Sequence, residues 1–192
     1  MIKKLFLVLM VLGLICGFVS GPGMAADDLK FQDSDLAKIY YFDQWGSSFQ
    51  LPSTKWSFIG EQENEQLRAA MFSFRREAIV DKSKTPVMAN VTFIFEKVPL
   101  NTNLDNYSAR SLKRAPLIIK NKFTAKEGPI TIKNAVGYMG TYRSPDGIDH
   151  SLILVHAISA GKGMQIMMDI TSELAPKVIK EFYTILNTLK FK

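Results

Sequence analysis

The sequence contains a single cysteine among its 192 residues, and this residue, Cys16, lies within the first 25 positions. If that segment is removed on export, the remaining chain can form no disulfide, no cysteine-based metal site and no thiol nucleophile. The domain must then be stabilised by its hydrophobic core rather than by covalent cross-links. Hydrophobic residues make up 47% of the sequence, which is enough to supply such a core.

Catalytic motifs are also missing. The sequence has neither the Gly-x-Ser-x-Gly segment of an α/β-hydrolase nor a phosphate-binding P-loop. Gly161-Lys162-Gly163 begins like a dinucleotide fingerprint, but Ile166 stands where the third glycine should be. A hairpin turn is therefore the better interpretation of this segment. We predict a protein that is not an enzyme and uses no cofactor.

Histidine is scarce as well, since His150 and His156 are the only two. His156 lies within an aliphatic run, where a histidine is most often a hydrogen-bonded core residue. Its alternative roles are proton transfer and metal ligation. One alternative hypothesis is therefore a small-ligand or metal-binding protein with His156, Asp169 and a methionine as its site. Another is a hydrolase with a dispersed site that includes His156.

Three methionines close to the end of the chain raise the question of a thioether copper site: Met164, Met167 and Met168. Side chains alternate between the two faces of a strand, so Met164 and Met168 would share one face while Met167 points to the other. Core packing is the better explanation for them. If the hairpin closes at Gly161, His156 is expected to lie across from Ile166 or Met167.

The first 25 residues have the pattern of a secretory signal peptide. Lys3 and Lys4 precede an uncharged apolar run over residues 5–19, and small residues at positions 23 and 25 suit a cleavage site. The run of 15 residues is shorter than the roughly 20 that a membrane-spanning helix needs. We therefore predict a periplasmic or secreted protein, cleaved near Ala25 and without a transmembrane segment after cleavage.

Lipid anchoring at Cys16 is the alternative to release. Ile15 is bulkier than the small residue that usually precedes a lipidated cysteine, so cleavage after Ala25 is favoured. Removal of 25 residues leaves 167 of the 192, enough for one domain, and the loss of Lys3 and Lys4 lowers the net charge from +6 to +4. A mildly basic charge suits an anionic membrane face or an acidic partner and does not establish nucleic-acid binding.

The mature chain is predicted to form one domain over residues 46–192, preceded by a lead-in over residues 26–45. In the lead-in, Leu36, Ile39 and Tyr40 recur at helical spacing and predict a short helix. In the domain, apolar and β-branched runs predict strands over residues 48–52, 56–59, 69–79, 87–98, 123–128, 130–140, 151–159 and 164–171, with a solvated turn over residues 61–65.

Two helices are predicted in the same domain. The first begins after Thr102 or Asn103 and ends at Pro116, and the second begins after Thr171 or Ser172. The apolar stripe of the second helix consists of Val178, Phe182, Ile185 and Leu189. The strand over residues 151–159 is apolar on both faces, which is typical of a central strand with layers above and below it. The pattern therefore predicts an α+β protein with a mostly antiparallel sheet.

A basic stretch is the candidate partner-binding surface. It contains Arg110, Lys113, Arg114, Lys120, Lys122 and Lys126, opposed mainly by Glu127. Lipid headgroups or an acidic protein would suit it. The alternative is an ordinary solvated helix face. The stretch lacks the interleaved aromatic residues that single-stranded nucleic acid requires, so we expect no nucleic-acid partner.

Several short segments resemble the PsbP-like family, which includes the bacterial periplasmic DcrB-type proteins. The resemblance covers residues 46–192. The matching segments are Phe49-Gln50-Leu51-Pro52 with Trp56, residues 89–96 (ANVTFIFE), Tyr107, Ala135-Val136-Gly137, Met168-Asp169-Ile170-Thr171, and the ending from Glu181-Phe182 to Phe191.

This resemblance implies a single-domain α/β/α sandwich around an antiparallel sheet, a fold also found in Mog1-like proteins. It also implies a binding or assembly role outside the cytoplasm, and it supplies no catalytic or ion-binding residues. The leading hypothesis is thus an exported, non-enzymatic envelope protein that binds a protein or an anionic membrane surface.

Overall fold

The computed structural model describes residues 29–32, 38–64, 68–115 and 117–192. The predicted signal peptide, Leu36 and Pro116 lie outside these ranges. The strands are β1 (Leu29–Gln32), β2 (Ile39–Phe42), β3 (Ser47–Gln50), β4 (Trp56–Asn64), β5 (Ala69–Arg76), β6 (Ile79–Val80), β7 (Pro86–Val87), β8 (Asn90–Lys97), β9 (Ile118–Thr124), β10 (Ala135–Arg143), β11 (Asp149–Ser159), β12 (Lys162–Thr171) and β13 (Lys190–Phe191). The helices are η1 (Asp43–Trp45), α2 (Leu104–Leu112) and α3 (Ala175–Thr188).

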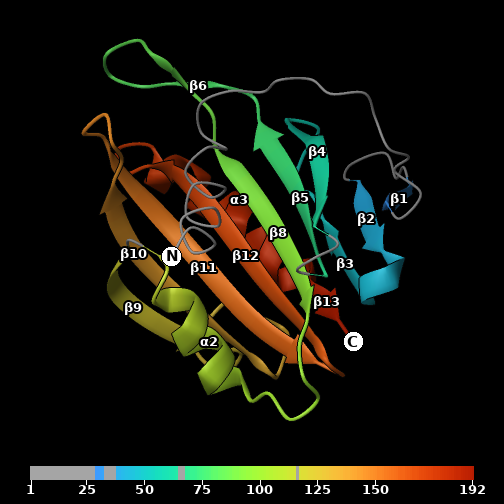
Figure 1. Cartoon of the computed structure of the whole chain (residues 1–192). Helices are drawn as coiled ribbons and strands as arrows, with labels where there is room; N and C mark the ends of the chain where they lie inside the picture. Colours follow the sequence, from blue (N-terminus) through green and yellow to red (C-terminus); the bar gives the residue numbers. More distant parts are fainter. Residues whose placement is uncertain (1–28, 33–37, 65–67, 116) are drawn as a thin grey trace.

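The central feature of the fold is a seven-stranded sheet in the order β4-β5-β8-β12-β11-β10-β9 (Figure 1). Every pair of neighbours in it is antiparallel. A four-stranded sheet, β1-β2-β3-β13, and the short pair β6–β7 complete the strands of the described residues.

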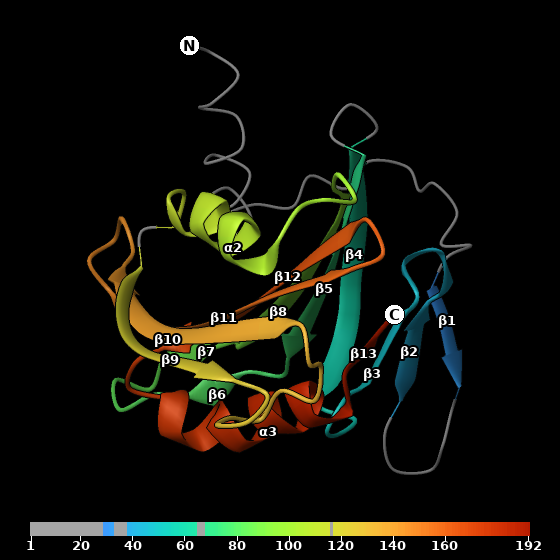
Figure 2. The same ribbon diagram turned by 90° about the horizontal axis from the view of Figure 1, so that it is seen from below.

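The two α-helices lie on opposite faces of the large sheet (Figure 2). Helix α2 covers one face, where Tyr107 packs with Val98 and Ile158. Helix α3 and the four-stranded sheet lie side by side on the other face, and α3 contacts β3. The structure therefore confirms a single-domain α+β protein with an α/β/α sandwich.

The main core lies on the α3 side of the sheet and is rich in phenylalanine. Phe72 on β5 and Phe93 on β8 are both fully buried, and the ring of Phe42 on β2 lies 4.4 Å from the first and 5.6 Å from the second. The ring of Phe49 on β3 stacks on Phe93 at 4.3 Å. Alternate residues of each strand point into this core, so side chains from the two sheets pack against each other there.

Several predicted elements are confirmed. Strands β11 and β12 form a hairpin with its turn at Ala160 and Gly161, both of which have positive φ. Asn103 caps α2, since its side chain accepts a hydrogen bond from the Asn106 backbone N–H at 2.8 Å. The predicted apolar stripe of the second helix is buried, with Val178 and Ile185 fully inaccessible. Strand β11 is central, as expected from its two apolar faces.

Other element predictions are wrong. Ile39 and Tyr40 belong to a strand rather than a helix, because β2 pairs with β3 and buries Tyr40 against Phe49 and Phe74. Residues 61–64 are not a turn but continue β4, where pairing with β5 supports a polar, half-exposed strand. The predicted cap residues Thr171 and Ser172 do not cap α3, whose N-cap is Leu174.

The segment between α2 and β10 is also arranged differently from the prediction. Residues 118–122 form most of β9, although the sequence favoured a strand over 123–128. Residues 125–134 contain no strand, so the predicted strand over residues 130–140 begins five positions later, at Ala135. Among the described residues, neither α-helix is long and apolar enough to cross a membrane.

Candidate functional site

The structure divides the basic stretch between two elements. Arg110 lies on α2, Lys113 and Arg114 follow at its C-terminal end, and Lys120 and Lys122 lie on β9. Helix α2 packs over β10 and β11, and β9 is the next strand beyond β10. The stretch is therefore not one solvated helix face. It surrounds the C-terminal end of α2 and continues along the sheet edge.

Arg110 is held by interactions within the protein. Its Nη2 lies 3.4 Å from Oε2 of Glu96 on β8, and its guanidinium carbon lies 5.6 Å from the centre of the Tyr107 ring. Gln165 donates a second hydrogen bond to Glu96, at 3.2 Å. Burial, reinforced by the nearby Glu96 carboxylate, raises the pKa of Tyr107. Arg110 thus contributes to the attachment of α2 to the sheet.

Strand β9 is the most exposed strand of the large sheet. All five residues from 118 to 122 are exposed, and Ile118 and Ile119 have exposed fractions of 70% and 44%. In the described part of the chain, β9 pairs with β10 alone, so its outer edge carries free backbone groups. The two adjacent isoleucines, followed by Lys120 and Lys122, make this edge both apolar and basic.

A β-bulge sets the direction of Lys120. Met139 on β10 lies opposite Asn121, and the next residue, Gly140, lies opposite Ile119, so Lys120 is the extra residue. Bulges redirect side chains in this way and are common beside binding sites. Lys122, beyond the bulge, lies opposite Tyr138 on the face that carries α2. The two lysines of β9 therefore flank the same edge from opposite faces of the sheet.

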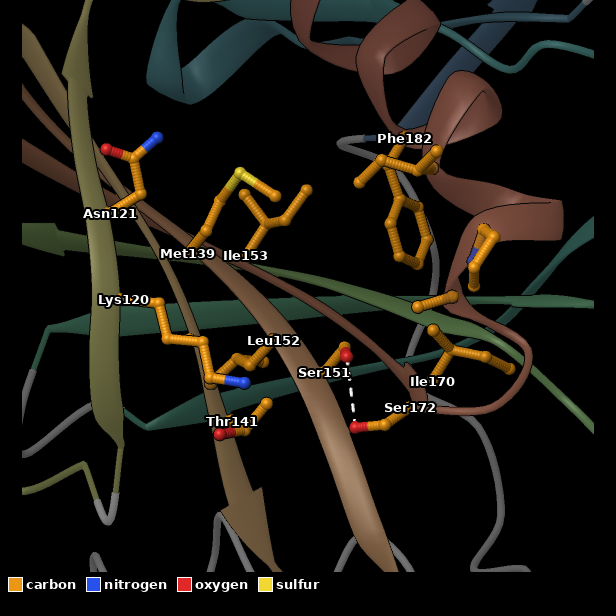
Figure 3. A pocket seen from close by; sticks show the side chains of 14 residues that line it. Lys120, Asn121, Met139, Thr141, Ser151, Leu152, Ile153, Ile170, Ser172 and Phe182 are labelled. Atoms are coloured by element: carbon orange, nitrogen blue, oxygen red, sulfur yellow. Dashed lines mark hydrogen bonds between the residues drawn. The ribbon is translucent and has the colours of Figure 1, made fainter.

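The Lys120 side chain lines a groove of about 450 Å³ between the start of α3 and strands β9 to β12 (Figure 3). The apolar lining comes from both layers: Met139, Ile153, Ile170, Ile179 and Phe182. Polar groups surround these residues on the strand side, and the Ser151 and Ser172 hydroxyls pair with each other at 3.1 Å. Sequence reasoning selected Lys120 but not the groove, because no local pattern shows where α3 stops covering the sheet.

His156 lies beneath α2, where the Ser108 hydroxyl links it to Tyr138 by hydrogen bonds. Its Nδ1 lies 2.8 Å from the Ser108 hydroxyl, which is also 2.8 Å from the Tyr138 hydroxyl. Burial lowers the pKa of His156 to about 4, so the ring is neutral at pH 7. His156 is fully inaccessible and Ser108 is 2% exposed. A hydrolytic nucleophile must reach its substrate, so this pair does not support the hydrolase hypothesis.

The proposed combination of His156, Asp169 and a methionine is wrong. His156 lies opposite Gln165, not Ile166 or Met167, and Asp169 lies opposite Leu152. At about 3.3 Å per residue, these two positions are separated by roughly 13 Å along β11. The described residues contain no group of three or more His, Cys, Asp or Glu side chains able to hold a metal ion.

The methionines follow the predicted alternation. Met164 and Met168 are fully buried in the main core on the α3 side of the sheet. Met167 lies on the opposite face, where it packs beside Tyr138 and Leu154. The structure therefore agrees with core packing for this segment.

Sequence reasoning missed a polar cluster centred on Asp169. His150 Nδ1 lies 3.1 Å from each carboxylate oxygen of Asp169, and the Tyr142 hydroxyl donates to the same carboxylate at 3.2 Å. The His150 and Tyr142 rings stack at 5.0 Å. The hydrogen bond that His150 donates to Asp169 raises the pKa of His150, while burial and then Asp169 raise the pKa of Tyr142. The hairpin register could have revealed the pair, since positions 150 and 169 are diagonal neighbours on one face.

The geometry described above defines the fold class, and comparison with solved structures identifies it as the PsbP/Mog1-like fold. Cyanobacterial PsbP (CyanoP) from Synechocystis superimposes with a TM-score of 0.51 at 13% identity, covering 91% of this chain and 98% of its own. The Ran-binding protein Mog1p of Saccharomyces cerevisiae gives 0.50 at 8% identity, covering 82% and 96%.

A Pseudomonas aeruginosa protein of unknown function also shares the fold, with a TM-score of 0.50, 14% identity, and coverage of 85% of this chain and 97% of its own. No protein-family model matches the sequence, and no curated protein matches it. At these low identities the likeness extends to the fold and not to any site residue.

Proposed function

We propose that the protein is an exported, non-enzymatic binding protein of the cell envelope. Its partner-binding surface comprises the exposed edge of β9, residues 118–122, together with Lys113 and Arg114 at the end of α2. The partner is a protein with an acidic, extended segment. The signal-peptide pattern of residues 1–25 supports the location, and the absence of catalytic motifs from the sequence supports a binding role.

The exposed edge of β9 is the observation that carries this proposal. An extended peptide can add to such an edge through backbone hydrogen bonds, with side chains selecting its sequence. Ile118 and Ile119 supply apolar contact area, and Lys120 and Lys122 favour an acidic segment. Edge lysines also discourage unwanted pairing between copies of a protein, which is consistent with an edge reserved for a charged partner.

The α2 residues extend the same surface. Lys113 and Arg114 are exposed where α2 ends, whereas Arg110 forms an ion pair with Glu96 on β8. The fold is compatible with protein binding, since Mog1p, which shares it, is a Ran-binding protein. Fold alone does not define a partner, so the proposal rests on the β9 edge of this chain.

Site-specific photocrosslinking in intact cells tests the proposal. A photoreactive residue at position 119 should yield an adduct with one envelope protein. The same residue at Leu100, which is 87% exposed, is the matched control and should yield none. Charge reversal at Lys113, Arg114 and Lys122 should abolish the adduct, while reversal at the exposed α3 residues Lys177 and Lys180 should not.

Two outcomes would contradict this proposal. Equal adducts at positions 119 and 100 would show non-specific contact. Alternatively, the purified protein could sediment with vesicles rich in phosphatidylglycerol in a manner that depends on Lys113, Arg114 and Lys122. Such sedimentation, without a protein adduct, would replace the protein partner with an anionic membrane surface.

A further inference from the structure

The groove between α3 and strands β9 to β12 lies on the opposite face of the sheet from α2, and it shares Lys120 and Asn121 with the β9 edge. Its volume of about 450 Å³ falls within the range of roughly 300–1,000 Å³ that small-molecule sites occupy. The groove lies where the first half of α3 meets the sheet, with Pro176, Ile179 and Phe182 on the helix side and strands β9 to β12 on the other.

The lining of the groove is apolar on both walls. Met139 and Ile153 line it from the sheet and Phe182 from α3 (Figure 3), and Ile179 of α3 also belongs to the lining. Ile153 and Phe182 are buried at the base, while Met139 and Ile179 are only half-buried. Half-buried apolar side chains on both walls of an open groove favour an apolar occupant.

The charge at the groove is positive. Lys120 is the only charged residue among the described residues that line it, and the bulge in β9 turns its side chain toward Thr141. Asp149 interacts electrostatically with Lys120, and its carboxylate is held by Arg143 through hydrogen bonds of 2.9 and 3.2 Å. The described lining thus presents one cation and no carboxylate.

We propose that this groove binds a single-chain amphiphile with an anionic carboxylate head, such as a fatty acid. The acyl chain lies between Met139, Ile153, Ile179 and Phe182, and the carboxylate lies at Lys120. Lys120 would repel a cationic amphiphile, and a purely apolar ligand would form no ion pair with Lys120.

Calorimetric titration of the purified protein with dodecanoate, below the concentration at which it forms micelles, tests the site. We expect binding of one dodecanoate per chain, weaker binding of dodecanol and weaker still of dodecyltrimethylammonium. Lys120→Gln should weaken dodecanoate binding about tenfold, the loss expected for one charge-assisted hydrogen bond. Ile179→Glu should weaken it more, because it places a like charge in the acyl-chain path.

Lys122→Gln is the matched control. It lies on the same strand but on the α2 face, so dodecanoate binding should be unchanged. Asp149→Asn should strengthen binding, since it removes a negative charge that interacts with Lys120. The proposal is overturned if dodecanoate does not bind, if the cationic amphiphile binds as tightly, or if folded Lys120→Gln and Ile179→Glu variants bind like the unmodified protein.

Discussion

His150 and Asp169 are joined across the β11–β12 hairpin, with His150 Nδ1 3.1 Å from both oxygens of the Asp169 carboxylate. The side chains are 12% and 17% exposed, so water screens the pair only in part. The other histidine, His156, is six residues further along β11 and has no carboxylate partner in the described structure. Two histidines on one strand thus have opposite electrostatic environments.

The two histidines should titrate in separate pH ranges. The hydrogen bond that His150 donates to Asp169 raises the pKa of His150 above 6.5, whereas burial lowers the pKa of His156 to about 4. Histidine side-chain NMR should therefore show one ring that titrates above pH 6.5 and one that stays neutral to about pH 5. Asp169→Asn should move only the first titration, toward lower pH. A shift of both rings, or of neither, would contradict the assignment.

Neutral His156 should make the protein sensitive to acid. The unfolded chain binds a proton at this residue below about pH 6.5, but the folded chain does not until about pH 4, so stability falls as the pH drops between these values. The full difference is about 3 kcal/mol. Denaturant unfolding at pH 7, 5.5 and 4 should show that the free energy of unfolding falls less with decreasing pH in His156→Gln than in the unmodified protein. Parallel losses in the two proteins would exclude this role.

The His150–Asp169 pair contributes in the opposite direction. Because its folded-state pKa is raised, His150 contributes stability that is present below about pH 6.5 and lost as the pH rises through the folded value. His150→Gln should therefore lower the free energy of unfolding more at pH 5.5 than at pH 8. Thermal unfolding at the two pH values measures this, and Asp169→Asn should show the same pH dependence. An equal loss at both pH values would indicate a packing effect alone.

The parts of the fold that sequence reasoning predicted are those fixed by local chemistry. Turn residues and continuous apolar runs specify the β11–β12 hairpin, and the stripe of Val178, Phe182 and Ile185 specifies α3. The β2 strand could not be predicted in the same way. Its residues also fit helical spacing, and only pairing with β3 and the aromatic core decides between the two.

The candidate site was predictable only in part, for a similar reason. The sequence alone shows that the basic residues lie close together along the chain. Their division between α2 and β9 depends on where β9 begins, and no local sequence pattern marks the bulge at Lys120. The His150–Asp169 pair required the exact hairpin register, and an error of one position moves every side chain to the other face. The groove depends on helix placement, which no sequence pattern in this chain specifies.

Glu181 should be the most important carboxylate for attaching α3 to the sheet. It accepts hydrogen bonds from Arg76 Nε on β5 at 3.0 Å and from Trp56 Nε1 on β4 at 2.6 Å. The Arg76 and Glu181 side chains are only 11% and 22% exposed. Glu181→Ala should cost about 2–4 kcal/mol, since it leaves a partly buried cation and an indole N–H without an acceptor.

Denaturant unfolding with a double-mutant cycle checks the Glu181 prediction. Arg76→Met combined with Glu181→Ala should cost less than the sum of the two single variants, because neither charge is then left alone. The ion pair between Arg143 and Asp149 is a matched control on the surface, with side chains 69% and 59% exposed. Asp149→Asn should leave stability within experimental error. If Asp149→Asn lowered the free energy of unfolding as much as Glu181→Ala, burial would not explain the difference between the two ion pairs.

Gly163 should be intolerant of any side chain, because Tyr107 of α2 lies directly above it. A Cβ atom at position 163 would lie 2.7 Å from Cε2, Cζ and Oη of Tyr107, whose own side chain is 1% exposed. Gly163→Ala should therefore cost about 1–3 kcal/mol of unfolding free energy through overpacking. Tyr107→Phe should not relieve this cost, since Cε2 and Cζ remain. Tyr107→Leu should relieve it, because the shorter side chain leaves room for the added methyl. Equal costs of Gly163→Ala in the Tyr107→Phe and Tyr107→Leu backgrounds, measured by denaturant unfolding, would show that contact with the ring is not the cause.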